Sequence, residues 1–562
     1  MKRTQTRRIE TALELVATLL GLVLLNVLAD SYFFRLDLTE DQRYTLSAAT
    51  ERALEDLNEG VYVEVYLEGT LNADLKRLQK ATREKLEEFR DYAEVPITYR
   101  FVDPNELTEE GEQRQRFFQQ LTRMGIPPTQ VTRQEEGKVM QETVFPGAVI
   151  RYGNEEKGVL LLKGNKADTP EQQLNQSIEN IEFELISALQ QMAQEKKPLI
   201  GMVSNIDGLR DQDTYSFRQA MSEAYIIDQI DLEKREPIGY DALILAQPKK
   251  RLSQTQRYRL DQYIMRGGKV LFLIDKVQMN LDSIATGGTY AFGYDLNLQD
   301  MLFSYGVRIN IDLIQDQLLH GFITVNTGNY GNQANLKRLP WLYHIIVNKF
   351  AKHPITRNLD AVYMRFASTI DTVRSAGVRK TPLLFTSKYS RIRKCPTMVD
   401  INEIKQIGRQ PELFNKQHLP VAYLLEGEFS SVYSGRFPPR QFDRNKYRKQ
   451  SEPTRLLVCS DGDLIRNEFN PRTNQPLPLG YDPATQGMFS NQEFIENALA
   501  YLIDPDGIIA SRNRVVKMRP LDRTRIQEER RKWQVVNLGL PLVLLALLGG
   551  GLIWWRRKRY AK

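Results

Sequence analysis

The carboxyl-terminal run of the chain limits what it can fold into more than any other feature. Residues 535–555, VVNLGLPLVLLALLGGGLIWW, contain no charged side chain. At about 1.5 Å of rise per residue, a helix of this length crosses a hydrocarbon core of roughly 30 Å. Trp554 and Trp555 close the run, and the basic segment 556–562 comes after them. The pattern predicts a transmembrane helix with an aromatic anchor and a cytoplasmic basic tail.

A second apolar run lies near the amino terminus, after a basic tip at residues 1–8. Its core, residues 15–29, spans a bilayer only when it is extended back to Ile9. We predict a transmembrane helix over residues 9–29, with a signal peptide cleaved after Ala29 as the alternative. Because the flanking positive charges stay inside, both interpretations export the chain beyond residue 29. The expected location is the cytoplasmic (inner) membrane, with both termini cytoplasmic and the bulk periplasmic.

The net charge of the chain argues against nucleic acid as a partner. The total is +7, but residues 1–8 carry four basic side chains and residues 556–562 carry five, with no acid in either segment. Removing these nine charges leaves −2 for everything between them. The exported region therefore has no basic surplus for phosphate backbones, and the lipid bilayer is the expected partner of the two tips.

Residues 30–168 are expected to form a first α/β domain. The pattern alternates as a strand over 61–69, becomes helical over 71–89, and continues with a strand, a polar helix near 106–124 and two more strands around 145–164. This βαβαββ order, followed by a helix, is similar to that of a thioredoxin-like domain. The junction after the first strand is Leu-Glu-Gly-Thr-Leu and holds no cysteine. We therefore expect a thioredoxin-like scaffold without redox chemistry, used for contact.

An amphipathic connecting helix is expected over residues 169–197. Thr169 is placed to cap it, Pro170 and Gln172 occupy its first turn, and Pro198 ends it. Its apolar positions recur every three or four residues, which suits a core helix packed on the next domain or a partner-binding coiled coil.

Residues 198–515 are expected to form an open, mostly parallel α/β sheet. The apolar strands PLIGMVSN, DALILAQP, KVLFLID and RLLVCSDGD alternate with helical patterns at 214–224 and 253–267. A juxtamembrane segment, 516–534, would join this domain to the second anchor. The fold class is therefore α/β, with two exported α/β domains between two terminal transmembrane helices.

Open α/β sheets bind ligands beyond the carboxyl ends of their strands. The polar residues there are the candidates for a ligand cleft: Ser204, Asn205, Asp207, Gln247, Asp275, Lys276, Ser460, Asp461 and Asp463. The turn from Ser460 to Asp463 could hold a cation or bind hydroxyl groups, although a tight turn capped by aspartate is the simpler interpretation.

Motifs for catalysis, metals and cofactors are missing from the sequence. It contains no GxSxG elbow, no Walker A loop and no CxxC or HExxH spacing. Its two cysteines, Cys395 and Cys459, could form a bridge outside the cytoplasm, but a free buried thiol is favoured for Cys459 in its apolar strand. We expect no enzyme activity, no metal site and no cofactor. Any nucleotide energy would come from another chain.

Several runs stand in a fixed order along the exported region: LDLTEDQRYTLS (36–47), VYLEGTLNADLKRLQKATREKLEEFR (65–90), FVDPNE (101–106), LNLQDMLFSYGVRIN (296–310), HPITRNLDAV (353–362), SDGDLIRN (460–467) and LGYDPATQGMFSNQEFIENALAYL (479–502). Together they resemble the GldG family, a gliding-motility-associated auxiliary, substrate-binding-like membrane component of an ABC transporter in Bacteroidetes. Where that family tends to have a Gly-His-Gly-Glu-like turn, this chain has Ser-Asn-Ile-Asp at 204–207.

The resemblance implies a non-catalytic subunit that works with a polytopic ABC permease and a cytoplasmic ATPase, linked to gliding motility or its secretion machinery. It also implies that the second domain is of the type shared with intraflagellar-transport proteins, with a periplasmic glycan or protein as ligand. Two alternatives stay open. One is a stand-alone periplasmic glycan or peptide receptor, and the other is a membrane-tethered hydrolase that uses Asp461 and Asp463.

The second anchor has an unusual composition for a helix that faces lipid alone. Pro541 lies near its start, and Gly549, Gly550 and Gly551 lie in its later half. Small residues allow close approach of another helix in a membrane. We expect either a contact with a permease helix at this patch or a flexible tether.

Overall fold

The computed structural model describes ten long segments and five isolated residues of the chain. The segments are 45–106, 111–135, 138–163, 169–194, 196–279, 288–330, 333–402, 410–443, 447–504 and 523–560, and the isolated residues are Ala17, Leu20, Gly21, Ile284 and Gly507. Residues 44–514 form one compact unit, and residues 1–43 with 515–562 form the other. Apart from the first three isolated residues, the predicted first span at 9–29 lies outside the described residues.

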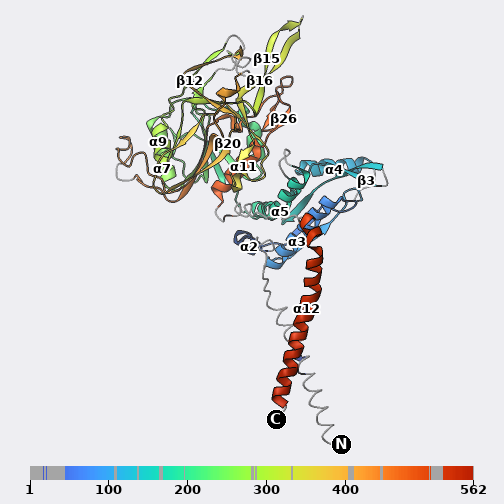
Figure 1. Cartoon of the computed structure of the whole chain (residues 1–562). Coiled ribbons are helices and arrows are strands. Elements are labelled where there is room, and N and C mark those ends of the chain that lie inside the picture. The colour runs from blue at the N-terminus through green and yellow to red at the C-terminus, as the bar shows by residue number, and fades with distance from the viewer. Residues whose placement is uncertain are drawn as a thin grey trace, which may run out of the picture. The chain divides into compact units, whose positions relative to one another are not determined.

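The amino-terminal part of the larger unit, which contains α3, α4 and α5 in Figure 1, has a sheet. The sheet has four strands in the order β2-β1-β5-β6. β1 (Val61–Val65) pairs in parallel with β2 (Ile97–Phe101) and antiparallel with β5 (Gly147–Tyr152). β5 continues into β6 (Glu155–Leu160) as a hairpin. Apart from the hairpin described next, these strands and the helices between them follow one another in the order predicted from the sequence.

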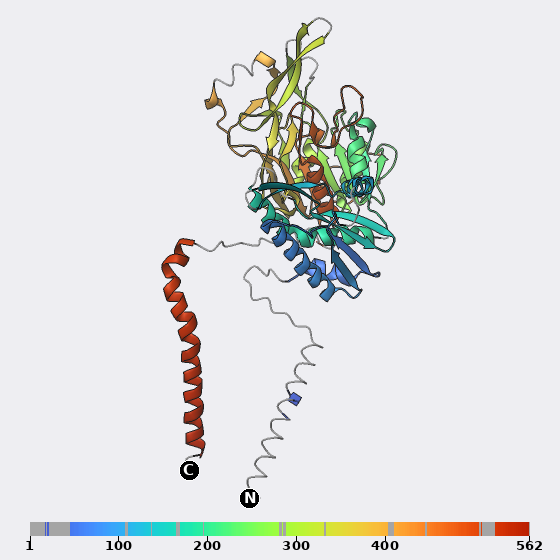
Figure 2. The same ribbon diagram turned by 90° about the vertical axis from the view of Figure 1, so that its right-hand side faces the viewer.

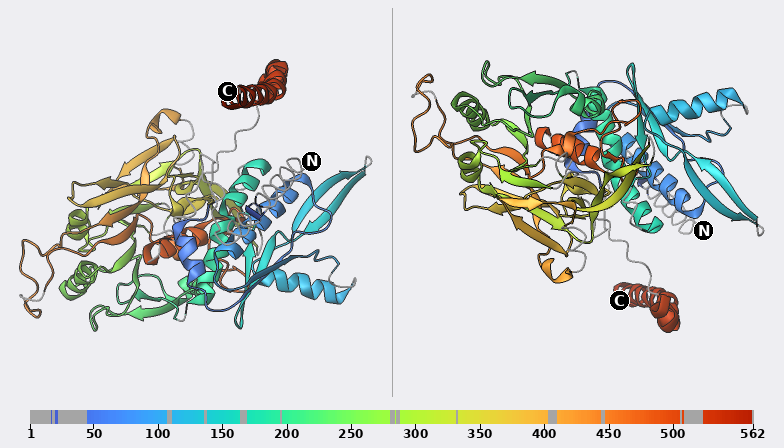
Figure 3. Two further views of the ribbon diagram at one scale, coloured as in Figure 1. Left: turned by 90° about the horizontal axis from the view of Figure 1, so that it is seen from below. Right: turned by 90° about the horizontal axis from the view of Figure 1, so that it is seen from above.

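A second hairpin in this part was not predicted from the sequence. β3 (Thr129–Glu135) and β4 (Lys138–Val144) pair with each other, outside the four-stranded sheet, and project beyond it (Figure 3). Helix α4 (Glu112–Arg123) precedes the hairpin and is shorter than expected. The segment is rich in polar residues, so it carries little of the hydrophobic periodicity from which strands are predicted.

Three more helices complete this part: α2 (Ala48–Glu55), α3 (Ala73–Tyr92) and α5 (Pro170–Ala193). Leu78 of α3 and Leu185 of α5 share one core with Val63 of β1. Thr169 and Gln172 make the predicted capping box at the start of α5. Because its apolar face is buried in the core, α5 is a core helix and not a free coiled coil.

The larger sheet of the unit has eight strands. In spatial order they are β17 (Lys349–Phe350), β20 (Val378–Phe385), β23 (Pro420–Gly427), β24 (Thr454–Cys459), β10 (Lys269–Leu273), β9 (Ala242–Ala246), β7 (Leu199–Val203) and β8 (Ile226–Ile230). The four predicted strands are the parallel neighbours β24, β10, β9 and β7. The antiparallel extension through β23, β20 and β17 was not predicted.

Helices cover both faces of this sheet, and β9 shows why. Ile244 and Ala246 face the core that contains α6 (Tyr215–Met221) and α11 (Asn491–Ile503). Leu243 and Leu245 face the core that contains α7 (Gln254–Met265) and α9 (Gln299–Tyr305). A strand that is buried on both faces does not alternate polar with apolar residues, and the sequence of β9, ALILA, is apolar throughout.

The remaining strands form small sheets within residues 277–488. They are β11 (Val277–Gln278), β12 (Thr289–Gly293), β13 (Val307–Ile309), β14 (Asp312–Asp316), β15 (His320–Tyr330), β16 (Gln333–Val347), β18 (Val362–Arg365), β19 (Ile370–Thr372), β21 (Ser390–Lys394), β22 (Thr397–Val399), β25 (Tyr481–Asp482) and β26 (Gly487–Met488). Cys395 and Cys459 are both free thiols, so no bridge joins them.

The smaller unit contains α12 (Arg523–Tyr560), one continuous helix with Pro541 inside it (Figure 2). Residues 532–555 of this helix are apolar and long enough to cross a membrane. The predicted span at 535–555 lies within them. Because α12 begins at Arg523, part of the predicted juxtamembrane segment, 516–534, belongs to the same helix.

Candidate functional site

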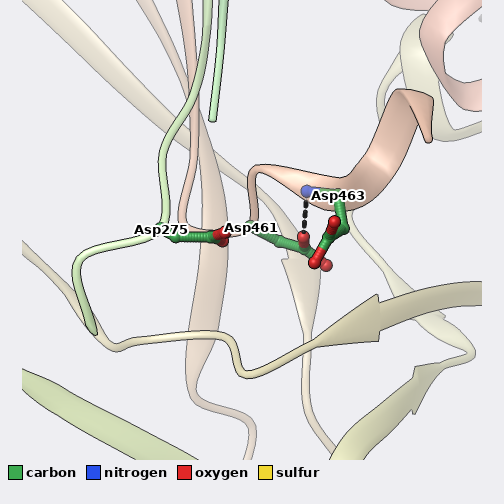
Figure 4. Close-up of side chains that lie close together, drawn as sticks. All are labelled: Asp275, Asp461 and Asp463. Carbon is green, nitrogen blue, oxygen red and sulfur yellow. Dashed lines mark hydrogen bonds between the residues drawn. The ribbon is translucent and has the colours of Figure 1, made fainter. Parts of the chain in front are cut away.

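Three aspartates meet where two neighbouring strands of the eight-stranded sheet end. Asp275 follows β10, and Asp461 and Asp463 follow β24, its parallel neighbour. A carboxylate oxygen from each lies within 4.8 Å of those of the other two (Figure 4). Asp275 and Asp461 are buried, and Asp463 is half-buried. We name Asp275, Asp461 and Asp463 the aspartate cluster.

Main-chain amides hold the two buried carboxylates of the aspartate cluster in place. The Oδ1 of Asp461 accepts a hydrogen bond from the main-chain N–H of Asp463 (2.7 Å), and its Oδ2 accepts one from that of Arg365 (2.6 Å). The main-chain N–H of Gly462 donates to Asp275 Oδ1 (2.6 Å). These donors stabilise the ionised form of each carboxylate and fix its direction.

Gln247, one of the predicted cleft candidates, lies at the end of β9 and contacts the cluster. Its Nε2 donates to Asp275 Oδ2 (2.8 Å) and to Asp463 Oδ1 (3.0 Å). The turn that follows β24 passes so close to Gln247 that a Cβ added at Gly462 would lie 2.8 Å from the Cα of Gln247. Glycine at 462 therefore allows the turn to reach the glutamine and both strand ends.

Burial and mutual repulsion raise the pKa values of the two buried aspartates. Burial, followed by the charge of Asp463, raises the pKa of Asp275 to about 7. Burial and the charges of Asp275 and Asp463 place the pKa of Asp461 well above its ordinary value. Two carboxylates in one desolvated place cannot both ionise freely, so the cluster favours a bound positive charge, whether a proton or a cation.

Two arginines that the sequence did not single out lie around the cluster. Arg466 Nη1 is 3.4 Å from Asp463 Oδ1. Arg365, on β18, has its Nη2 2.6 Å from Glu468 Oε1, and its charge also interacts with that of Asp463. Arg466 follows the strand end by only a few residues and could have been proposed from the sequence. Arg365 could not, because its strand lies almost a hundred residues away.

The other five predicted cleft residues do not join the cluster. Ser460 donates through Oγ to the main-chain carbonyl of Ser368 (2.6 Å). Lys276 donates through Nζ to the carbonyl of Tyr294 (2.8 Å), and burial lowers its pKa. Both side chains donate to main-chain carbonyls instead of to the aspartate cluster.

The first residues after β7 contact the end of β8. The main-chain N–H of Ser204 donates to the carbonyl of Ile230 at the end of β8 (2.9 Å), and Asn205 Nδ2 lies 3.4 Å from Asp231. Asp207 is exposed. Because β8 lies at the edge of the sheet beyond β7, these contacts direct Ser204 and Asn205 toward that edge.

The geometry does not favour hydrolysis that uses Asp461 as the general base. Asp461 has no exposed surface, and both its oxygens already accept main-chain hydrogen bonds. The neighbouring hydroxyl of Ser460 is equally buried and donates to a carbonyl. A general base must reach the proton that it removes from a nucleophile, and neither group is accessible to a substrate.

A separate cleft of about 700 Å³ lies within the larger unit, between β6 and α5 on one side and α6 and α11 on the other. Lys163 Nζ and Glu184 Oε2 make an ion pair across 2.7 Å at its wall. Burial raises the pKa of Glu496, on α11, to about 7, although Gln492 donates to its carboxylate (2.8 Å). Segments that are far apart in the chain line this cleft, so it could not be predicted from the sequence.

Two family models match the chain. Residues 197–498 match a family described as an ABC-type uncharacterized transport system. Residues 40–151 match a domain of unknown function. The first match begins in the connection between α5 and β7, where the larger sheet starts.

The chain is also similar to single proteins. An uncharacterized protein of Borreliella burgdorferi is 20% identical over 576 residues, and the alignment covers 100% of each chain. Among solved structures, the mmIFT52 N-terminal domain is similar to 55% of this chain and over 98% of its own length, with 13% identity and a TM-score of 0.32.

Proposed function

The chain belongs to the family described as an ABC-type uncharacterized transport system, and we propose that it is the membrane-anchored, non-catalytic auxiliary subunit of a complex with a polytopic permease and a cytoplasmic ATPase. The match over residues 197–498 carries this proposal. It covers the whole larger sheet, and the one helix of the described residues that is apolar and long enough to span a membrane lies beyond it in the chain.

The proposed contact with the permease is the glycine patch of α12, Gly549 to Gly551. A Cβ added at Gly549, Gly550 or Gly551 would meet no atom within 4 Å. The patch therefore offers bare helix backbone to a neighbour, and close packing of that kind is how helices associate in lipid. Pro541, earlier in the same helix, removes a main-chain donor and suits a helix that packs against protein better than one surrounded by lipid.

The proposed topology places both termini in the cytoplasm and residues 30–532 in the periplasm. The basic clusters beside each apolar run support it. A tag after Lys562 should resist protease added to intact spheroplasts, while the exported region is cut. Digestion of the tag would refute the topology, and a mature chain that begins at Asp30 would show that the first span is a cleaved signal.

The role proposed for residues 30–168 is that of a thioredoxin-like contact scaffold. The strand order β2-β1-β5-β6 supports it, as does the lack of cysteine at the end of β1. The link to gliding motility or its secretion machinery is also a proposal, and it rests on the resemblance of the sequence to the GldG family.

A second candidate function is a receptor that presents a glycan or peptide to a transporter. The cleft of about 700 Å³ favours it, because a volume of this size accommodates a small-molecule ligand. A permease bound at stoichiometric amounts supports the first function. A monomer with micromolar affinity for a sugar supports the second.

Substitution in the glycine patch tests the proposed coupling. Gly550→Leu should release the permease during detergent purification, because a branched side chain separates the two helices, while insertion and the fold of the exported region stay intact. Leu548→Phe is the matched control, since residue 548 lies about 200° around the helix and adds bulk to the opposite side. Equal recovery of the permease with both variants would refute a contact at this patch.

A further inference from the structure

We infer that the cleft of about 700 Å³ binds an organic ligand that carries a primary ammonium group, such as the lysine side chain of a peptide. The inference names the ligand class for the receptor that is the second candidate function, and it rests on that function. A cavity of this size accommodates a small molecule or a short piece of peptide and is far larger than a metal ion needs. Its charges, one carboxyl group and its aromatic side chains indicate the class of ligand.

The side chains that line the cleft carry a surplus of negative charge. Among the described residues, its cationic side chains are Lys157 and Lys163. Lys163 pairs with Glu184 at 2.7 Å, and Lys157 donates to Gln191. Six carboxyl groups against two lysines leave four negative charges when all are ionised. The six are Glu184, Glu223, Asp360, Glu493, Glu496 and Asp504. A neutral or anionic ligand would cover these carboxylates without a counter-charge, whereas a cation supplies one.

Glu496 is the carboxyl group best placed to receive the ammonium group. It is half-buried on α11, at the wall of the cleft. Gln492 donates to its Oε1 (2.8 Å), and Oε2 accepts no hydrogen bond from the residues that the structure describes. Burial, with the charge of Glu493, raises its pKa to about 7, so the surroundings do not compensate its negative charge. An ammonium group beside Oε2 would donate a charge-assisted hydrogen bond and supply that compensation.

Aromatic side chains at the wall favour an organic ammonium group over a hydrated inorganic cation. Tyr225, Phe183 and Phe489 line the cleft. Burial, followed by the charges of Glu496 and Asp504, raises the pKa of the Tyr225 phenol, so this ring is neutral and lies near both carboxylates. A neutral aromatic ring attracts an ammonium group and also packs against the methylene chain that carries it. A lysine side chain has both parts.

Calorimetry on the full chain in an uncharged detergent tests the ligand class. At about pH 8, where Glu496 is mostly ionised, trilysine with blocked termini should bind at one molecule per chain. It should bind at least tenfold more tightly than trialanine with blocked termini, and acetylation of its side chains should remove the difference. Spermidine is the second arm, because a polyamine carries the same group. The tighter of the two ligands shows whether a peptide or a polyamine supplies it.

Glu496→Gln should weaken the binding of trilysine or spermidine at least tenfold. The variant should stay folded, since it removes a charge that burial disfavours. Glu171→Gln, in the exposed first turn of α5 and outside the cleft, is the matched control and should leave binding unchanged.

Two results would overturn the ammonium ligand and leave the receptor function standing. They are binding that is equally tight in the Glu496→Gln variant, and binding of trialanine or maltotriose that matches that of trilysine and spermidine. Because the acetylated peptide is compared on the unmodified chain, the ligand class is tested even if a variant does not fold. Failure of trilysine, spermidine, trialanine and maltotriose alike to bind would overturn the receptor function as well.

Discussion

Replacement of Glu496 by glutamine should make the protein more stable at neutral pH and leave its stability in acid unchanged. Glu496 lies on α11 at the wall of the cleft, where burial raises its pKa from 4.5 to about 7 and the charge of Glu493 adds to the effect. The folded protein therefore holds a proton on this carboxyl group over a pH range in which the unfolded chain has already released it.

The sign and size of the effect come from linkage. Below about pH 4.5 both states are protonated, and the group contributes nothing. As the pH rises toward 7, the unfolded state alone ionises, so stability falls, and above pH 7 the full penalty is present. A difference of about 2.5 pH units corresponds to roughly 3 kcal/mol, which is an upper value because the side chain is half-buried and water reaches part of it.

Thermal unfolding of the purified full chain between pH 4.5 and pH 8 measures this effect. The midpoint for Glu496→Gln should equal that of the unmodified protein at the acid end and exceed it by a few degrees at the alkaline end. Glu493→Gln is the matched control. It removes an exposed carboxylate from the same helix turn but leaves the buried carboxyl group in place, so the midpoint should gain much less at the alkaline end than with Glu496→Gln. A difference for Glu496→Gln that stays constant with pH would refute the raised pKa.

Three further predictions concern backbone packing, the sheet core and catalysis. Gly462→Ala should destabilise the protein by about 1–3 kcal/mol, because the added Cβ would lie 2.8 Å from the Cα of Gln247. Gly435→Ala is the control and should be neutral, since a Cβ there meets nothing within 4 Å; the midpoints of thermal unfolding of the two variants are compared. Leu457→Ala, in the middle of β24 and fully buried, should cost about 2–5 kcal/mol, and a loss below about 1 kcal/mol would contradict the packing of the sheet. The purified chain should hydrolyse no ATP, as measured by phosphate release, and hydrolysis that survives purification to homogeneity would contradict a non-catalytic role.

The sequence predicted the elements whose patterns are strong and local. The capping box at Thr169 and the fully apolar strands β7, β9 and β10 are such elements, because capping geometry and two-sided burial leave a direct mark on the residues themselves. The antiparallel strand β20 was missed, since its sequence VRKTPLLF mixes exposed and buried positions and contains proline.

The candidate site was predicted in part for the same reason. Gln247, Asp275 and Asp461 lie just beyond strands that are parallel neighbours, so strand order alone brings them together. Asn205 also lies beyond a predicted strand, but β7 has the unpredicted edge strand β8 beside it, and Asn205 contacts Asp231 there. The order of strands within a sheet depends on tertiary packing, which sequence periodicity does not contain.

Purification of the full-length chain from its native membranes tests the central proposal most directly. The chain would be tagged after Lys562, extracted in mild detergent and isolated, and the proteins that accompany it at stoichiometric amounts would be identified by mass spectrometry. An auxiliary subunit of an ABC-type system should bring with it one polytopic permease and one ATPase, and loss of α12 should abolish their recovery. Isolation of the intact chain as a monomer, free of any ABC permease or ATPase, would contradict the account.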